Sequence, residues 1–329
     1  MTIRNSFLVT IVLIAAPAHA EQLFATIDAM PLSSGETFRN CSVGYRISGE
    51  LNDDRSNIVV FPTWFTGTAA TLEQAGLIGP GKLADTNRYY VIAFDALANG
   101  VSCSPSNSPE FPTITTEDMV RSQHIVLTEH LGIDHVHAVM GISMGGMQTF
   151  RWLAMYPEFM DKAVPIDGTP RMTTYDILQW QTHKDVIRAL QSGGTSEAGI
   201  NRILSRLNLL TLYTPDYFVE SVQPIDLPAF LQESDEATVL APDDYVAQLD
   251  AMIDHDVLGP DGSLVSDVRA DVLVVGVPSD HMVNAVPGKR VAEIIAAEYL
   301  QVDSNCGHMG TTCEVELVET KVNQFLATN

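Results

Sequence analysis

The chain is poor in basic residues. It contains 18 lysines and arginines against 41 acidic residues, and its formal net charge is −23 at pH 7. A surface this acidic repels nucleic acid and anionic membranes, so we expect neither as a partner. It also disfavours a site for a polyanionic cofactor, unless basic residues gather locally, and we expect no cofactor.

Cysteine is also scarce, with four residues in the whole chain. No C-x₂-C pair occurs, so neither a zinc site nor another metal site is expected. An even number of cysteines in an exported protein indicates disulfides, and four of them allow three pairings. Cys306 and Cys313 are close in sequence and form the simplest pair, which leaves Cys41 with Cys103. The alternative is four reduced, buried thiols.

Long apolar runs are missing after the N-terminus, and a transmembrane helix needs roughly 20 such residues. The N-terminus itself combines Arg4, the ten-residue, mostly apolar stretch Phe7–Ala16 and the sequence Ala18-His19-Ala20. These are the three parts of a secretory signal peptide, so we predict cleavage after Ala20 and a periplasmic or secreted protein. The alternatives are an uncleaved anchor or a disordered tail.

Short apolar runs alternate with helical patterns through most of the remaining chain, whose 46% hydrophobic content supports a substantial core. Strands are expected at 57–61, 89–94, 136–141, 162–166, 271–277 and 299–302, and helices at 116–130, 288–298 and 315–325. Several of the strands are apolar throughout, which is typical of a parallel sheet buried on both faces. The sequence therefore predicts an α/β fold with a mostly parallel sheet between helices.

An all-helical block interrupts this alternation, with helical spacing at 174–190, 197–211 and 241–255. Because a strand-like run resumes at Asp271, we interpret the block as a cap over the carboxyl edge of the sheet, where open α/β sheets place their sites. The predicted organisation is a signal peptide (1–20), a core (21–168 and 265–329) and an inserted helical cap (169–264). A second independent domain is the alternative, and the pattern leaves the oligomeric state unknown.

A serine with glycines two residues before and two residues after it follows the strand expected at 136–141. The segment Gly141-Ile142-Ser143-Met144-Gly145 fits G-x-S-x-G, with an apolar run before it and a helical pattern after it. In the sharp strand-to-helix turn of this motif the serine hydroxyl is lifted clear of the sheet, and the small flanking residues let strand and helix approach. We therefore predict Ser143 as a nucleophile. The alternative is a buried serine that a tight turn tolerates.

A nucleophilic serine needs a base and an orienting acid, which on this kind of sheet follow in the order Ser, Asp or Glu, His. His308 lies in the loop directly after the last strand-like run, where the base belongs. Asp280 follows the run V-L-V-V-G-V, one strand–helix–strand unit earlier, and is the predicted acid. Asp303, which ends the last strand, is the rival acid.

Two backbone N–H groups should hold the oxyanion that forms during acyl transfer. One belongs to Met144, which follows the serine at the start of a helix. The other should come from the loop after the first central strand, at Phe61–Thr68. Phe65, or its neighbour Trp64, is the candidate there.

Four segments resemble the homoserine O-acetyltransferase-like branch of the α/β-hydrolase superfamily. They are the nucleophile signature, an N-G loop, the oxyanion loop and the histidine segment: G-I-S-M-G-G-M-Q (141–148), F-D-A-L-A-N-G-V-S-C-S-P-S-N (94–107), T-W-F-T-G (63–67) and D-S-N-C-G-H (303–308). The resemblance runs from about residue 59 to the end and is weakest in the cap. It implies an α/β-hydrolase fold and a catalytic triad of Ser143, Asp280 and His308.

Two positions depart from that branch. Its acetyltransferases follow the catalytic histidine with an aspartate that helps hold the amino group of homoserine, and Met309 stands in this place. Their oxyanion loop carries a histidine where this chain has Thr63. In the cap, Arg206 and Tyr213 resemble residues near the substrate carboxylate, although a structural ion pair fits the arginine nearly as well. Together with Trp64 and Met309, they are the candidate substrate contacts.

These features favour an exported serine hydrolase that cleaves acyl or acetyl esters of small molecules through an acyl-enzyme. The second hypothesis is an O-acyltransferase of the homoserine O-acetyltransferase type, in which an alcohol replaces water. Its usual donor, acetyl-CoA, carries phosphates that lysines and arginines would bind, and it is not expected outside the cytoplasm. The third is a catalytically inactive binding protein of the same fold, which the loss of a triad residue would favour.

Overall fold

The computed structural model describes residues 20–237, 240–259 and 267–328. The predicted signal peptide, apart from Ala20, lies outside these residues. Within them, no helix is both long enough and apolar enough to cross a membrane.

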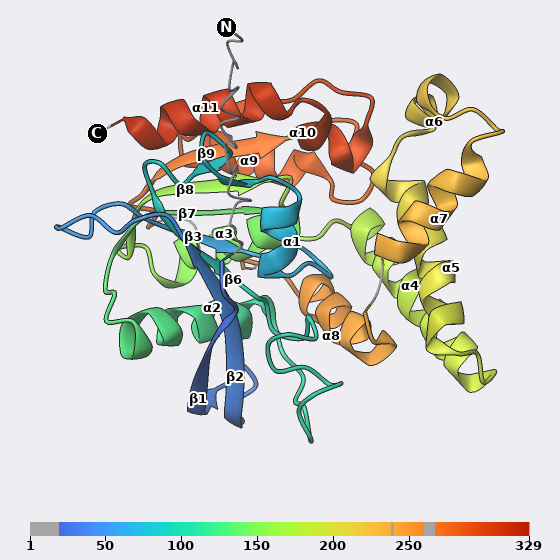
Figure 1. Ribbon diagram of the computed structural model, residues 1–329, viewed down its shortest axis with the longest axis horizontal. Coiled ribbons are helices and arrows are strands. Elements are labelled where there is room, and N and C mark those ends of the chain that lie inside the picture. Colours follow the sequence, from blue (N-terminus) through green and yellow to red (C-terminus); the bar gives the residue numbers. More distant parts are fainter. Residues whose placement is uncertain (1–19, 238–239, 260–266, 329) are drawn as a thin grey trace, which may run out of the picture.

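An eight-stranded sheet forms the centre of the molecule (Figure 1), in the order β1-β2-β6-β3-β7-β8-β9-β10. The strands are β1 (Leu23–Pro31), β2 (Thr37–Ser48), β3 (Ile58–Pro62), β6 (Tyr90–Phe94), β7 (Val136–Ile142), β8 (Met160–Ile166), β9 (Asp271–Gly276) and β10 (Glu298–Gln301), beside a separate pair, β4 (Ile78–Gly79) and β5 (Ala84–Asp85). The strands from β6 to β10 pair in parallel, and the hairpin β1–β2 joins β6 in the antiparallel direction. The expected mostly parallel sheet is confirmed, while the hairpin is not among the elements expected from the sequence.

Helices cover both faces of this sheet. Helices α2, α3 and α9 cover one face, and α1 and α11 cover the other. The described helices are α1 (Ala69–Gln74), α2 (Thr116–Ile125, continued by a π-helical turn, Val126–His130), α3 (Met144–Met155), α4 (Thr174–Ser192), α5 (Glu197–Leu212), α6 (Pro215–Ser221), α7 (Leu227–Ala237), α8 (Pro242–Ile253), α9 (Ala285–Ile294), α10 (Gly310–Cys313) and α11 (Val315–Ala327). The helix expected at 288–298 ends at Ile294, because Ala296 adopts a left-handed φ of 54° and Glu298 begins β10. That part of the prediction is wrong.

The core consists of two apolar layers that the sheet separates. Successive residues of β3 point to opposite faces, so Ile58 and Val60 join one layer while Val59 and Phe61 join the other. Buried residues of α2, α3 and α9 belong to the first layer, and those of α1 and α11 to the second. Because the central strands are buried on both faces, their polar backbone can meet a substrate only at their ends.

The chain leaves the sheet after β8 and returns to it at β9, with α4 to α8 between the two strands in sequence. Helix α4 packs against α8, and α5 packs against α7. In Figure 1 the helices α4 to α7 lie together on the right-hand side, far from the hairpin β1–β2, and α8 lies between them and the sheet. This helical insertion is the segment expected to be a cap.

Candidate active site

Ser143 occupies the turn between β7 and α3, in a backbone conformation that side chains rarely adopt (φ 58°, ψ −120°). Its N–H donates to the carbonyl oxygen of Ile166 at the end of β8, at 2.9 Å. The turn leaves no room for a side chain two residues before or two residues after the serine. A Cβ on Gly141 would lie 2.4 Å from the backbone of Gly145, and a Cβ on Gly145 would lie 2.5 Å from the carbonyl oxygen of Pro62. The two glycines therefore permit the close packing of β7, α3 and β3 that presents the serine.

A continuous hydrogen-bond chain leads from this serine to an aspartate. Ser143 Oγ lies 2.9 Å from His308 Nε2, and His308 Nδ1 lies 2.6 Å from Asp280 Oδ2. The three residues are 6–7% exposed, and they stand in loops after three strands of the sheet, β7, β9 and β10. Because a carboxylate only accepts, the proton of the neutral imidazole sits on Nδ1, and Nε2 is free to accept the serine proton.

Asp280, and not Asp303, contacts the histidine. The second oxygen of Asp280 accepts hydrogen bonds from the N–H groups of Met282 (2.7 Å) and Val283 (2.9 Å). These two donors fix the orientation of the carboxylate. Asp303 is exposed and accepts from the side chain of Gln301 at 2.8 Å.

The His308 loop is closed by a covalent link. Disulfides join Cys306 to Cys313 and Cys41 to Cys103, as the simplest pairing predicts.

Burial by itself lowers the pKa of His308, but the charge of Asp280 and its hydrogen bond outweigh burial, so the pKa lies above its ordinary value of 6.5. The imidazolium form that a general base passes through is thereby stabilised.

The loop proposed for the oxyanion is held by the cap. Thr66 adopts a left-handed φ of 65°, unusual for a β-branched residue, and its N–H donates to Gln248 Oε1 of α8 at 2.9 Å. The ring of Phe65 packs edge-on against Tyr245 of α8 and Trp180 of α4. Among the described residues, the N–H groups of Trp64 and Phe65 have no hydrogen-bond partner.

Met144 begins α3, and the N–H groups of a first helical turn have no partner within their helix. The N–H of Met144 therefore remains available beside the serine. The described residues thus offer unpaired backbone donors both in the loop after β3 and at the start of α3.

The four residues expected to contact substrate have different surroundings. Arg206 is engaged within the cap, where its guanidinium pairs with both oxygens of Asp235, so the alternative of a structural ion pair describes it. The ring of Tyr213 stacks on Tyr217 at 4.3 Å between centroids. Its backbone lies against the histidine loop, since a Cβ on Gly307 would come within 3.3 Å of the Tyr213 carbonyl carbon.

Trp64 and Met309 are the other two residues expected to contact the substrate. The Trp64 indole covers Gly67 in the oxyanion loop, where an added Cβ would lie 2.5 Å from the ring nitrogen. Met309 follows His308 directly and is partly buried.

Sequence reasoning missed a buried carboxyl at the site. Asp167 follows β8 directly and accepts a hydrogen bond from Thr311 Oγ1 at 2.6 Å. Its charge interacts with both His308 and Asp280. The signal was present in the sequence, because A-V-P-I-D is an apolar strand ending in aspartate, the same pattern that identified Asp280.

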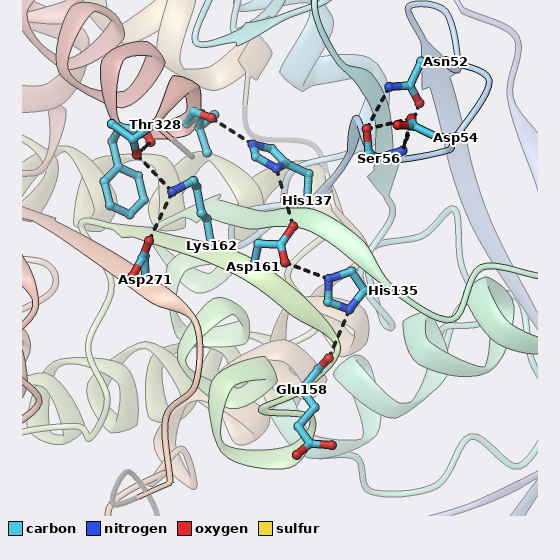
Figure 2. Close-up of polar contacts among 12 residues, drawn as sticks. Asn52, Asp54, Ser56, His135, His137, Glu158, Asp161, Lys162, Asp271 and Thr328 are labelled. Carbon is cyan, nitrogen blue, oxygen red and sulfur yellow. Dashed lines mark hydrogen bonds and ion pairs between the residues drawn. The ribbon is translucent and has the colours of Figure 1, made fainter.

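Two other histidines lie at the opposite, amino-terminal edge of the sheet. Figure 2 shows Asp161 between His135 and His137, with His135 also bonded to the backbone oxygen of Glu158. His135 and Asp161 are exposed and His137 is partly buried, and the three lie where β7 and β8 begin. Across the described ranges, no group of three or more histidine, cysteine or acidic side chains is placed to hold a metal ion.

The fold and the serine turn define an α/β-hydrolase. The chain matches the family described as alpha/beta hydrolase fold over residues 57–311, well over half of its length, and it belongs to that family. Its relatives include homoserine O-acetyltransferases as well as esterases, so the expected likeness to the homoserine O-acetyltransferase-like branch is confirmed.

Three relatives illustrate the range. An ethyl acetate hydrolase of Pseudomonas veronii is 35% identical over 182 residues, which cover 54% of this chain and 51%, about half, of that enzyme. A homoserine O-acetyltransferase of Chlorobium chlorochromatii is 29% identical over 326 residues, 89% of this chain and 91% of the relative. An acetylester hydrolase structure from Corynebacterium glutamicum superposes with a TM-score of 0.85 at 24% identity, over 94% and 96% of the two chains. The similarity to the acetylester hydrolase structure establishes the fold.

Proposed function

We propose that this protein is a serine esterase that removes short acyl groups, acetyl first among them, from small-molecule esters. The observation that carries the proposal is the hydrogen-bond chain from Ser143 through His308 to Asp280. In the reaction, Ser143 Oγ attacks the ester carbonyl while His308 Nε2 takes its proton, and Asp280 stabilises the imidazolium. His308 then gives that proton to the departing alcohol, which leaves an acyl-enzyme.

The backbone donors complete this mechanism. The N–H groups of Met144 and Phe65, or Trp64 in place of the latter, hold the negative oxygen of the tetrahedral intermediate. Water, activated by the same His308, attacks the acyl-enzyme and releases the acid.

Three features favour hydrolysis over acyl transfer from acetyl-CoA. The chain carries 18 basic against 41 acidic residues, a poor surface for the phosphates of CoA. Met309 offers no carboxylate to an amino group, and Arg206 is already paired with Asp235. Two relatives with the matching fold are named for the hydrolysis of acetyl esters.

An O-acyltransferase is the second candidate. It is favoured by the similarity to a homoserine O-acetyltransferase over 91% of that relative's length. A catalytically inactive binding protein is disfavoured, because all three side chains of the expected triad are present and in contact.

The test is turnover of an aryl acetate by the purified protein, with Ser143→Ala as the matched variant. We expect release of the aryl alcohol by the wild type and a loss of about 10⁶-fold in Ser143→Ala. Full activity of Ser143→Ala would exclude Ser143 as the nucleophile. Adding homoserine and acetyl-CoA separates the two candidates, since only a transferase yields O-acetylhomoserine.

We further propose export with cleavage after Ala20, which places the protein in the periplasm or outside the cell. Its two disulfides support an oxidising compartment. Intact mass of the protein secreted by a host that exports it should correspond to a chain that begins at Glu21. A full-length mass confined to the cytoplasmic fraction would contradict the proposal.

A further inference from the structure

Asp167 is a buried carboxyl that the proposed mechanism does not use. It is 3% exposed, and one of its oxygens accepts the hydroxyl of Thr311 at 2.6 Å. The other oxygen is buried and has no hydrogen-bond partner among the described residues. A buried carboxylate with an unpartnered oxygen is costly, so its presence beside the triad calls for a reason.

The backbone places this carboxyl between the serine turn and β9, the strand that precedes Asp280. The N–H of Asp167 donates to the carbonyl oxygen of Val275 in β9, while the preceding residue, Ile166, accepts from the N–H of Ser143. Asp167 has a left-handed φ of 47°, a strained conformation that concentrates at functional sites. The chain then passes α3 so closely that a Cβ on Gly168 would lie 2.6 Å from the backbone of Gly146.

Three titratable groups interact with Asp167, from three different elements. Burial raises the pKa of Asp167 to about 7, with His308 opposing this effect and Asp280 adding to it. In return, the charge of Asp167 is one of the causes that raise the pKa of His308. The third is Tyr299 of β10, whose pKa is raised by burial and, less strongly, by Asp167. The Asp167 carboxyl therefore changes its charge near neutral pH, within electrostatic range of the proposed base.

We propose that Asp167 is a positioning residue, a second carboxyl that acts on the charge of His308 together with Asp280 and is held in place by Thr311. The inference rests on the proposed function of the same site. When His308 takes the proton of Ser143, the imidazolium lies in the field of two carboxylates instead of one. The proton stays on His308 until the leaving alcohol receives it, and Asp167 neither accepts it nor touches the substrate.

The first test is the pH profile of kcat/KM in Asp167→Asn. Asparagine keeps the shape and can still accept the Thr311 hydroxyl, but it carries no charge. We expect the acid limb to move to lower pH and the plateau to fall between about threefold and tenfold, because one unit of pKa is a tenfold change in proton affinity. KM should stay close to that of the wild type.

Asp161→Asn is the matched control, since Asp161 is an exposed carboxyl of the same strand, β8, near its other end. The Asp161→Asn variant should leave both the acid limb and the plateau of the kcat/KM profile unchanged. Thr311→Val keeps the carboxyl but removes the hydrogen bond that favours its ionised form. This variant should move the limb in the same direction by a smaller amount, and it decides the question if Asp167→Asn does not fold.

The second test places Asp167→Asn in an Asp280→Asn background. If Asp167 supports His308, its loss should reduce the residual rate by a larger factor there than in the wild type. Equal factors in both backgrounds, together with an unmoved acid limb in the folded single variant, would overturn the proposal.

A probe that needs no particular ester separates this inference from the proposed function. The rate at which a fluorophosphonate modifies Ser143 depends on His308 but on no acyl specificity, so its pH profile can be measured in every variant. Modification without aryl acetate turnover would contradict the esterase while leaving the shift in Asp167→Asn measurable. Turnover of the acetate with an unmoved profile in Asp167→Asn would contradict the role of Asp167 alone.

Discussion

Two histidine–aspartate pairs lie at opposite edges of one sheet. His308 bonds to Asp280 at 2.6 Å, with side-chain exposures of 7% and 1%. His135 bonds to Asp161 at 2.9 Å, with exposures of 48% and 58%. Both pairs join an imidazole to a carboxylate at hydrogen-bond distance, through Nδ1 of His308 and through Nε2 of His135, and their surroundings differ most.

The difference shows what burial adds to an ion pair. At the exposed edge, water and salt screen the charges, so the pair contributes little. At the buried edge, Asp280 is fixed by two backbone N–H groups and the histidine loop is closed by a disulfide. Burial, fixed donors and a serine on the far side of the ring turn the same two residue types into candidates for catalysis.

The largest expected effect comes from removing one charge of the buried pair. Asp280→Asn should lower kcat of aryl acetate hydrolysis by about 10⁴-fold, because the histidine loses its orientation and its counter-charge. Asp161→Asn should change it by less than about twofold, since an exposed pair contributes little. The measurement is steady-state kinetics on variants whose circular dichroism matches the wild type. Equal losses of kcat in Asp280→Asn and Asp161→Asn would show that the buried and the exposed pair contribute equally to activity.

The two disulfides should separate stability from activity. By loop length, replacing Cys41–Cys103 (62 residues apart) with alanines should cost about 4 kcal/mol of unfolding free energy, and replacing Cys306–Cys313 (7 apart) about 2 kcal/mol. The second, less costly replacement should nevertheless lower activity more, since it frees the loop of His308. Urea unfolding and kinetics on both double variants check this. If the replacement of Cys41–Cys103 lowers activity more, the loop of His308 keeps its conformation without the Cys306–Cys313 disulfide.

Buried histidines without an acid partner should make the fold sensitive to acid. Burial lowers the pKa of His255 to about 3 and that of His183 to about 4. The unfolded chain therefore takes up protons first, so this stabilisation is complete above about pH 6.5 and is lost as the pH falls toward these values. The unfolding free energy should decline by about 1 kcal/mol per pH unit for each histidine. Denaturation between pH 7 and 4 should show a shallower slope in His255→Asn and an unchanged one for the exposed His130→Asn.

The pH profile of the proposed ester hydrolysis should report the buried pair directly. His308 must be neutral to take the serine proton, and its pKa is raised above 6.5. The acid limb of kcat/KM should therefore lie above pH 6.5, with activity gained as the pH rises through it. A limb below pH 6.5 in the wild type would contradict the influence of Asp280 and Asp167 on the base.

The smallest effect belongs to the exposed pair. Replacing both His135 and Asp161, by glutamine and asparagine, should change the unfolding free energy by less than about 1 kcal/mol. The change should shrink further at high salt, because exposed charges are screened. Thermal melts in low and high salt are sufficient, and a larger or salt-independent loss would show that this edge is more than a solvated surface.

Much of this architecture could be predicted from the sequence. Short apolar runs predicted the six strands β3 and β6 to β10. Several of them are apolar throughout, because a strand buried on both faces has no polar side to expose. The hairpin β1–β2 escaped because its buried and exposed residues follow no regular alternation along either strand. The positions of Ser143, Asp280 and His308 were predictable because each follows a recognisable strand.

The sequence by itself determined the class of fold, the serine turn and the order of the residues that follow the strands. Only the tertiary structure decided which carboxyl reaches the histidine, since Asp280, Asp303 and Asp167 all lie in loops that follow strands of the sheet. It also brought Gln248 of α8 against Thr66 in the loop after β3, over 182 residues of sequence. Contacts of that range depend on packing, and no local pattern of residues encodes them.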